Sequence, residues 1–179
     1  MKKNLLDLRA GAFISSDTRL AWVWLIARVY VGWIWLEAGL EKFSNPAWNG
    51  ENAGTAITGF LNGALKLASG DHPAVLSWYA TLIRQIALPN AELLSYIVTY
   101  GEIVIGVSLI LGFLTAKAAG FGALMNLNFM LAGSAGLNPV MFIIQILLIV
   151  AWRTSGWLGL DRWVLPRLIS MDKKKRFFV

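Results

Sequence analysis

The feature that most constrains this chain is an apolar stretch from Leu20 to Lys42 that carries Arg28 near its middle. About 20 apolar residues are enough for a helix to cross the hydrocarbon core of a bilayer. A guanidinium that faced lipid at that depth would be costly, so Arg28 should face other helices or water. At about 100° per residue, the stripe that contains Arg28 also holds Gly32, Trp35, Gly39 and Lys42. Glu37 is predicted on the opposite side of the same helix.

Composition places the chain among membrane proteins. Of its 179 residues, 57% are hydrophobic and only 15% are charged, whereas a soluble domain has about 25% charged residues. The chain has no cysteine, which excludes disulfides, thiolate chemistry and iron–sulfur ligation within it. Its one histidine, His72, excludes a haem held by two histidines of this chain and a zinc site of several histidines. We therefore expect no metal site, and any redox chemistry needs a diffusible cofactor or a partner chain.

The apolar segments predict one all-α domain, a bundle of four transmembrane helices. The predicted spans cover about 19–43, 91–115, 117–134 and 138–158, with Asp17 or Ser16 capping the first. The outer connection, 44–90, is predicted to contain two short amphipathic helices, because each candidate helix is apolar on one face only. The first has Ile57, Leu61 and Ala64 on that face, and the second follows Asp71-His72-Pro73 and has Val75, Tyr79, Leu82, Ile83 and Ile86. We expect both to lie on the membrane surface or to cap the bundle.

The distribution of lysine and arginine predicts the orientation. With both termini in the cytoplasm, eleven of these residues lie on the inner side and three, Lys42, Lys66 and Arg84, on the outer side. The basic tail, 162–179, then lies against anionic lipid of the cytoplasmic leaflet. Because the positive charge collects at one membrane face, the net charge of +6 does not indicate binding to nucleic acid.

Arg28 and Glu102 form the central candidate pair. The second predicted span runs antiparallel to the first, and the depths of the two residues differ by about 7 Å at 1.5 Å per residue, which two long side chains can bridge. One interpretation is a structural ion pair that fixes helix register. The other is a polar binding site for a quinone head group or a proton-linked substrate, because intramembrane ionisable groups are functional candidates. The pattern leaves both open.

Further polar and small residues have two interpretations each. Glu37, with Glu41, could carry protons or form a wet rim. Asn126 and Gln145 could contact a ligand or join helices by hydrogen bonds. Trp35 could stack on a planar ring or serve only in packing. In the third span the small residues predict a face for close helix packing, which could be a homodimer interface, and these are Ala116, Ala119, Gly120 and Ala123.

Several short motifs, in their order along the chain, resemble the DoxX/DoxD family of small bacterial and archaeal four-span membrane proteins. They are Arg28, the G-L-E-K at 39–42, Glu102 with Gly106, the G-F-L-T at 112–115, and Asp161-Arg162. The resemblance implies a multi-pass protein of the bacterial or archaeal cytoplasmic membrane. The extended outer connection is similar to that of the DoxD branch, which implies the membrane subunit of a thiosulfate:quinone oxidoreductase. Without cysteine, persulfide chemistry cannot occur in this chain.

The resulting hypothesis is a membrane subunit of a quinone-interacting oxidoreductase. In it Arg28 hydrogen-bonds a quinone carbonyl and Glu102 moves the proton, as the catalytic pair. The residues that contact substrate are then Arg28, Trp35, Lys42, Glu37, Thr99, Asn126 and Gln145. The expected partners are the lipid bilayer, an oxidoreductase partner subunit and a second copy in a homodimer. The alternatives are a non-enzymatic scaffold or small-molecule-binding subunit, and a transporter formed by a dimer.

Overall fold

The structure, a computed structural model, describes residues 17–167, and within that range it is helical with no strand. The all-α prediction is therefore confirmed for the described residues. Asp17 caps the first turn, since its Oδ1 accepts a hydrogen bond from the amide of Arg19 at 2.8 Å. A further helical stretch covers 161–167. The elements are η1 (Thr18–Leu20), α2 (Ala21–Phe43), α3 (Thr55–Lys66), α4 (Ser77–Leu82), η2 (Ile83–Ala87), η3 (Leu88–Asn90), α5 (Ala91–Leu111), α6 (Thr115–Leu131) and α7 (Asn138–Val150).

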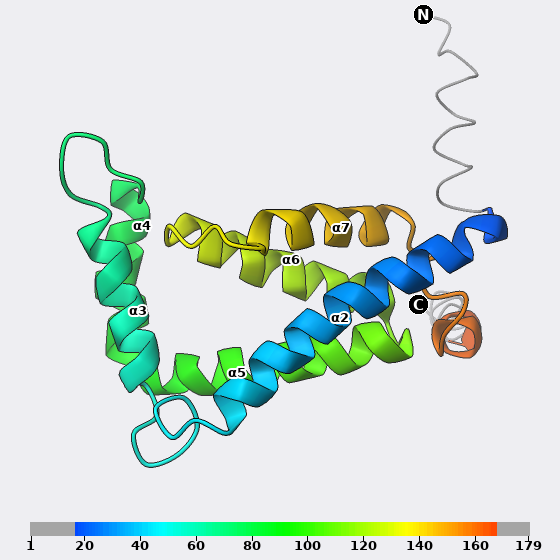
Figure 1. The fold of residues 1–179 in the computed structure, drawn as a ribbon, viewed down its shortest axis with the longest axis horizontal. Coiled ribbons are helices and arrows are strands. Elements are labelled where there is room, and N and C mark those ends of the chain that lie inside the picture. The colour runs from blue at the N-terminus through cyan, green and yellow to red at the C-terminus, as the bar shows by residue number, and fades with distance from the viewer. Residues whose placement is uncertain (1–16, 168–179) are drawn as a thin grey trace, which may run out of the picture.

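Two groups of helices make up the molecule (Figure 1). Helices α2, α5, α6 and α7 run lengthwise, while α3 and α4 stand crosswise at one end. The lengthwise group has a core around Val31, Trp35, Leu109 and Leu148. The crosswise pair has its own core around Ile57, Val75, Tyr79 and Ile83, which extends to Ala132 at the end of α6.

Glycines set the register between α2 and α5. A Cβ on Gly39 would lie 2.8 Å from the backbone nitrogen of Ile103, and one on Gly106 would lie 2.6 Å from that of Leu36. Neither position can hold a larger residue without separating the helices, so the two backbones stay in direct contact. The predicted stripe is buried as expected, and its buried members are Arg28, Gly32, Trp35 and Gly39.

Span length agrees with the prediction only in part. Within the described residues, two helical segments are long and apolar enough to cross a membrane, Thr18–Phe43 and Ser77–Leu111. α6 has 17 residues and α7 has 13, so they measure about 25 and 20 Å at 1.5 Å per residue. The prediction of a helix over 138–158 was too long, because turns occupy 151–160 after α7 ends.

The outer connection contains one of its two predicted helices as a separate element. α3 is that helix, with Ile57, Leu61 and Ala64 buried. The prediction that the second helix is a separate element was wrong. α4 continues through the π-helical turn η2 and the 3₁₀ turn η3 into α5. Pro89 lies in the first turn of η3, where its missing amide hydrogen is tolerated. The predicted break is therefore a bend, and the Leu82 and Ile86 side chains of the expected apolar face are exposed.

The small-residue face of α6 lies largely inside the chain. Ala119 and Ala123 are buried, and α6 packs along α7. A Cβ on Gly120 would meet nothing within 4 Å, whereas one on Gly122 would collide with Gln145 of α7. Ala119 and Ala123 are therefore packed within the chain, and a homodimer that uses the rest of this face stays a prediction.

Candidate functional site

Arg28 does not contact Glu102, so the predicted pair was wrong. Arg28 is buried, and its Nη1 donates to the carbonyl oxygens of Leu109 at 3.0 Å and Ile110 at 3.4 Å. Its Nη2 donates to the carbonyl oxygen of Leu158 at 2.5 Å. Leu109 lies seven residues beyond Glu102, about 10 Å along the helix at 1.5 Å per residue. The guanidinium thus occupies a position at the C-terminal end of α5, two turns from Glu102.

The end of α5 explains why a guanidinium is held there. The last carbonyls of a helix have no partner within it and carry partial negative charge. Gly112 ends the helix at φ 65°, and a Cβ there would collide with the Arg28 guanidinium. The turns after α7 close the site, because the amides of Leu160 and Asp161 donate to the carbonyls of Leu111 and Gly112. Arg28 therefore joins α2, α5 and the segment after α7, which is a structural role.

Asp161 completes this junction at the start of α6. Its carboxylate accepts hydrogen bonds from the amides of Leu114 at 2.6 Å and Thr115 at 2.8 Å. Leu114 is the one non-glycine residue among 17–167 with a positive φ, 49°. The sequence shows Asp161 only as part of a short motif, and no periodicity indicates that it caps a helix forty-six residues earlier.

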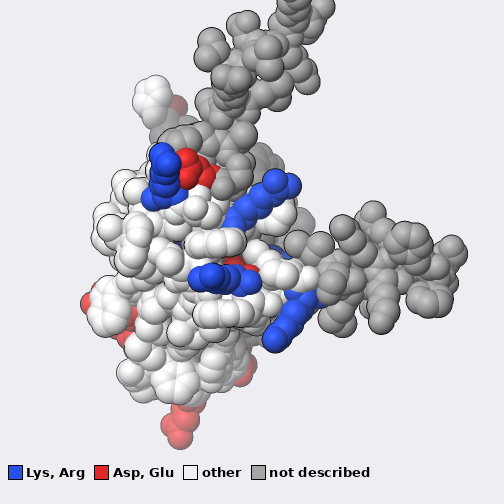
Figure 2. Space-filling model, turned by 90° about the vertical axis from the view of Figure 1, so that its right-hand side faces the viewer, with Lys and Arg blue, Asp and Glu red and all other residues white. Residues whose placement is uncertain are grey.

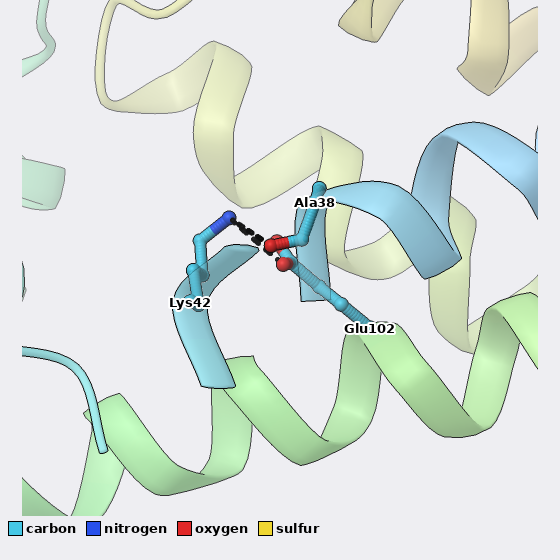
Figure 3. Close-up of polar contacts among 3 residues, drawn as sticks. All are labelled: Ala38, Lys42 and Glu102. Atoms are coloured by element: carbon cyan, nitrogen blue, oxygen red, sulfur yellow. Dashed lines mark hydrogen bonds and ion pairs between the residues drawn. The ribbon is translucent and has the colours of Figure 1, made fainter. Parts of the chain in front are cut away.

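Glu102 pairs with Lys42 instead (Figure 3). The Lys42 Nζ lies 2.8 Å from the Glu102 Oε2, and Nζ also donates to the Ala38 carbonyl oxygen at 3.4 Å. The Glu102 side chain is 2% exposed and that of Lys42 is 20% exposed. A carboxylate this deeply buried needs a charge partner, because its desolvation is otherwise uncompensated. Lys42 supplies it from the last turn of α2, where a cation also suits the helix dipole.

A cavity of about 290 Å³ opens beside this ion pair. Aromatic rings make up much of its wall. The ring centroids of Trp35 and Phe129 are 6.4 Å apart, and those of Phe60 and Phe129 are 5.9 Å apart. The Lys42 ammonium also lies 5.2 Å from the centroid of Trp48. The lining is completed by Ile34, Ala38, Ser134, Leu137, Asn138 and Met141. This volume lies at the lower end of the range for small-molecule sites, about 300 Å³.

A buried polar cluster lies next to Trp35. The Asn126 Nδ2 donates to the Gln145 Oε1 at 2.7 Å. This bond joins α6 to α7, as the interpretation of these residues as helix-joining groups predicted. The Gln145 Nε2 and the Trp35 Nε1 have no hydrogen-bond partner among the described residues. Both face Gly122, where an added Cβ would lie 3.1 Å from the Trp35 Nε1 and would collide with the Gln145 amide. These two donors face Gly122, which is not among the residues that line the cavity.

The remaining predicted residues fall into two groups. Thr99 is fully buried one turn before Glu102, and its Oγ1 has no partner among the described residues. Glu37 and Glu41 are exposed and do not line the cavity. Of the predicted site residues, the cavity wall thus includes Trp35, Lys42 and Glu102. Sequence reasoning missed part of the wall, namely Trp48, Phe60, Phe129 and the turn between α6 and α7. Hydrophobic periodicity does not show that α3 packs crosswise at the end of the bundle.

The described residues contain no group of three or more His, Asp or Glu side chains that could hold a metal ion.

Comparison with known proteins identifies the family. The DoxX family model matches residues 23–135, more than half of the chain. The match runs from α2 to the turn after α6, so it includes the outer connection and Glu102. No curated protein and no solved structure matches the chain. The resemblance seen in the motifs is confirmed, and with its two apolar membrane-length helices the chain belongs to the DoxX family of membrane proteins.

Proposed function

We propose that the chain is the membrane subunit of an oxidoreductase and that the cavity beside Lys42 and Glu102 binds the head group of a quinone. The observation that carries the proposal is the combination of aromatic walls with one buried ion pair. Aromatic rings pack well against a planar ring, and a few polar groups then fix its orientation.

The residues suit a quinone in three ways. The Trp35 ring lines the cavity and can pack against the planar ring of a quinone. Lys42 holds the carboxyl group of Glu102 at 2.8 Å and orients it. Glu102 can then pass a proton from water at the cavity rim, near Leu137 and Asn138, to the substrate. A quinone supplies a two-electron acceptor there, since two electrons from the partner subunit and two protons convert it to a quinol.

The cavity favours a quinone over thiosulfate. Lys42 is the cation of the cavity wall, and Glu102 neutralises it at 2.8 Å. A dianion would therefore meet no net positive charge in this cavity. The proposal assigns the sulfur chemistry of the DoxD branch, where a member performs it, to a partner subunit.

The proposal places four spans in the cytoplasmic membrane of a bacterium or archaeon, with both termini inside. The two long helices cross it, and α6 and α7 cross beside them with the turns at 151–160. Support comes from the core that all four helices share. It also comes from the exposed cations at one end of the bundle, Arg19, Lys117, Arg153 and Arg162. The basic tail beyond 167 lies outside the described residues.

The experiment is the substitution Glu102→Gln, which keeps the shape of the side chain and removes the acid. We expect normal folding and a loss of quinone reduction of about 10²–10⁴-fold, the usual contribution of general acid–base catalysis. Quinone reduction by purified protein with its oxidoreductase partner measures it, alongside thermal melting. Glu37→Gln is the matched control, because Glu37 is exposed on α2 outside the cavity. A well-folded Glu102→Gln variant with unchanged turnover would contradict the proton-transfer role and favour the scaffold alternative.

A further inference from the structure

A second cavity, of about 470 Å³, lies on the outward face of α5 and α6, away from the quinone cavity. The two cavities share no lining residue. Its wall is apolar apart from Ser108 and Lys117, and its most exposed side chains include Val104 and Phe121. We call this cavity the α5–α6 groove.

The length of the groove along α6 matches half of a bilayer. There it runs from Leu114 to Met125, which is about 16 Å at 1.5 Å per residue, and along α5 it extends from Phe113 to Ile97, about 24 Å. One leaflet contributes about 15 Å to a hydrocarbon core about 30 Å thick. Toward the deep end, Gly101 leaves space, because a Cβ there would reach only the Met125 side chain at 3.6 Å. The groove can therefore accommodate one acyl chain of one leaflet.

Charge identifies the kind of lipid. Lys117 stands at the shallow end of the groove, is exposed and forms no ion pair with another described residue. The same end of the bundle carries the exposed side chains of Arg19, Arg153 and Arg162, and Figure 2 shows several Lys and Arg side chains on this face. Of the acidic groups there, Asp161 is buried and engaged with the amides of α6, and the partly exposed Asp17 accepts a hydrogen bond from the amide of Arg19. Each cation near the surface favours an anionic lipid.

We propose that the α5–α6 groove binds one anionic phospholipid of the cytoplasmic leaflet. An acyl chain lies between α5 and α6, and the Lys117 Nζ donates to the head-group phosphate. The inference is independent of the quinone proposal, since it uses a different cavity and different residues.

The test is native mass spectrometry of the detergent-purified full chain, supplied with equal amounts of phosphatidylglycerol and phosphatidylcholine that carry the same acyl chains. We expect one retained phosphatidylglycerol. Lys117→Gln should reduce its preference over phosphatidylcholine about fivefold, the effect of one cation near a lipid surface. Lys66→Gln is the matched control, because Lys66 is an exposed lysine of α3 at the other end of the molecule.

A second variant tests the acyl-chain part of the groove. Gly101→Leu should fill the deep end beside Met125 and reduce retention of both lipids, while Lys117→Gln changes only the preference. Equal retention of the two lipids by the wild type would overturn the proposal. So would an unchanged preference in Lys117→Gln, or a lipid-free dimer whose formation Gly101→Leu abolishes, because a second copy would then occupy the groove.

Discussion

At the scale of single residues, the two cations of α2 have different roles. Arg28 has its guanidinium on three backbone carbonyls at the end of α5 and in the turns after α7. Lys42 neutralises a buried carboxylate beside a cavity. A planar guanidinium can reach several carbonyls at once, whereas an ammonium is a compact charge on a flexible stem. Arginine at 28 therefore suits the three backbone carbonyls, and lysine at 42 suits the single carboxylate of Glu102.

Arg28→Lys should destabilise the protein without altering quinone binding. A lysine cannot reach three carbonyls, and unpaired buried groups cost about 1–3 kcal/mol each. We expect the melting temperature in detergent to fall by several degrees, while Arg153→Lys, at an exposed position, leaves it unchanged. An Arg28→Lys variant that melts normally but no longer binds quinone would contradict the structural role and would indicate that Arg28 contacts the substrate.

At the scale of elements, helix ends and helix contacts decide the architecture. The carboxylate of Asp161 caps α6 from forty-six residues away, and Gly122 lets the Gln145 side chain lie against α6. Both connect segments that the sequence separates. The same holds for α3, whose Phe60 belongs to the cavity wall although the helix stands crosswise to the bundle.

Removal of the charge of the α6 cap should loosen the start of that helix. Asp161→Asn weakens two hydrogen bonds to backbone amides, and loss of a cap costs about 0.5–2 kcal/mol. Hydrogen exchange of the amides at 114–118 should accelerate. Asp71→Asn, at an exposed position in the outer connection, should leave those amides unchanged. Unaltered protection at 114–118 in Asp161→Asn would show that the cap contributes little.

Two neighbouring glycines of α6 should respond in opposite directions to alanine. Alanine is favoured over glycine inside a helix by about 1 kcal/mol. Gly120→Ala should therefore stabilise the protein, because nothing lies within 4 Å of the new Cβ. Gly122→Ala should destabilise it, because the Cβ would displace the Gln145 amide and disturb its bond to Asn126. Thermal melting of the two variants side by side measures the difference, and equal shifts would contradict the packing described.

The sequence predicted which faces are buried better than it predicted which side chains meet. The stripe of Arg28, Trp35 and Gly39 is buried as expected. Periodicity shows which way a side chain points around its own helix, but the sliding of one helix along another depends on close contacts such as Gly106 on Leu36. That register places Glu102 opposite Lys42. The carbonyl of Leu158, which Arg28 binds, lies in irregular backbone that periodicity cannot describe.

At the scale of the whole molecule, the two ends of the bundle differ. One end carries exposed cations and the α5–α6 turn, and the other carries α3, α4 and the cavity beside Lys42 and Glu102 (Figures 1 and 2). Lysine and arginine favour the cytoplasmic side of a membrane. The cavity beside Lys42 and Glu102 would then open toward the outer side, and the α5–α6 groove would face the cytoplasmic leaflet.

Single cysteines test this orientation, and the chain has no cysteine of its own to interfere. Asn62→Cys on α3 should react with an impermeant maleimide in intact cells, because Asn62 is exposed at the end predicted outside. Lys117→Cys should react only after the cells are opened. The reverse pattern would invert the orientation, and labelling of both sites in intact cells would contradict a membrane-spanning arrangement.

Photolabelling with an azido-quinone tests the central claim, that the cavity beside Lys42 and Glu102 binds a quinone, most directly. The purified protein is irradiated with the probe, with and without excess unlabelled quinone, and the labelled peptides are identified by mass spectrometry. The account predicts that competed label attaches to peptides that contain Trp35, Trp48, Phe129 or Met141, all from the cavity wall. Label that spreads over the lipid-facing residues of α5 and α6, and that excess quinone does not reduce, would contradict it.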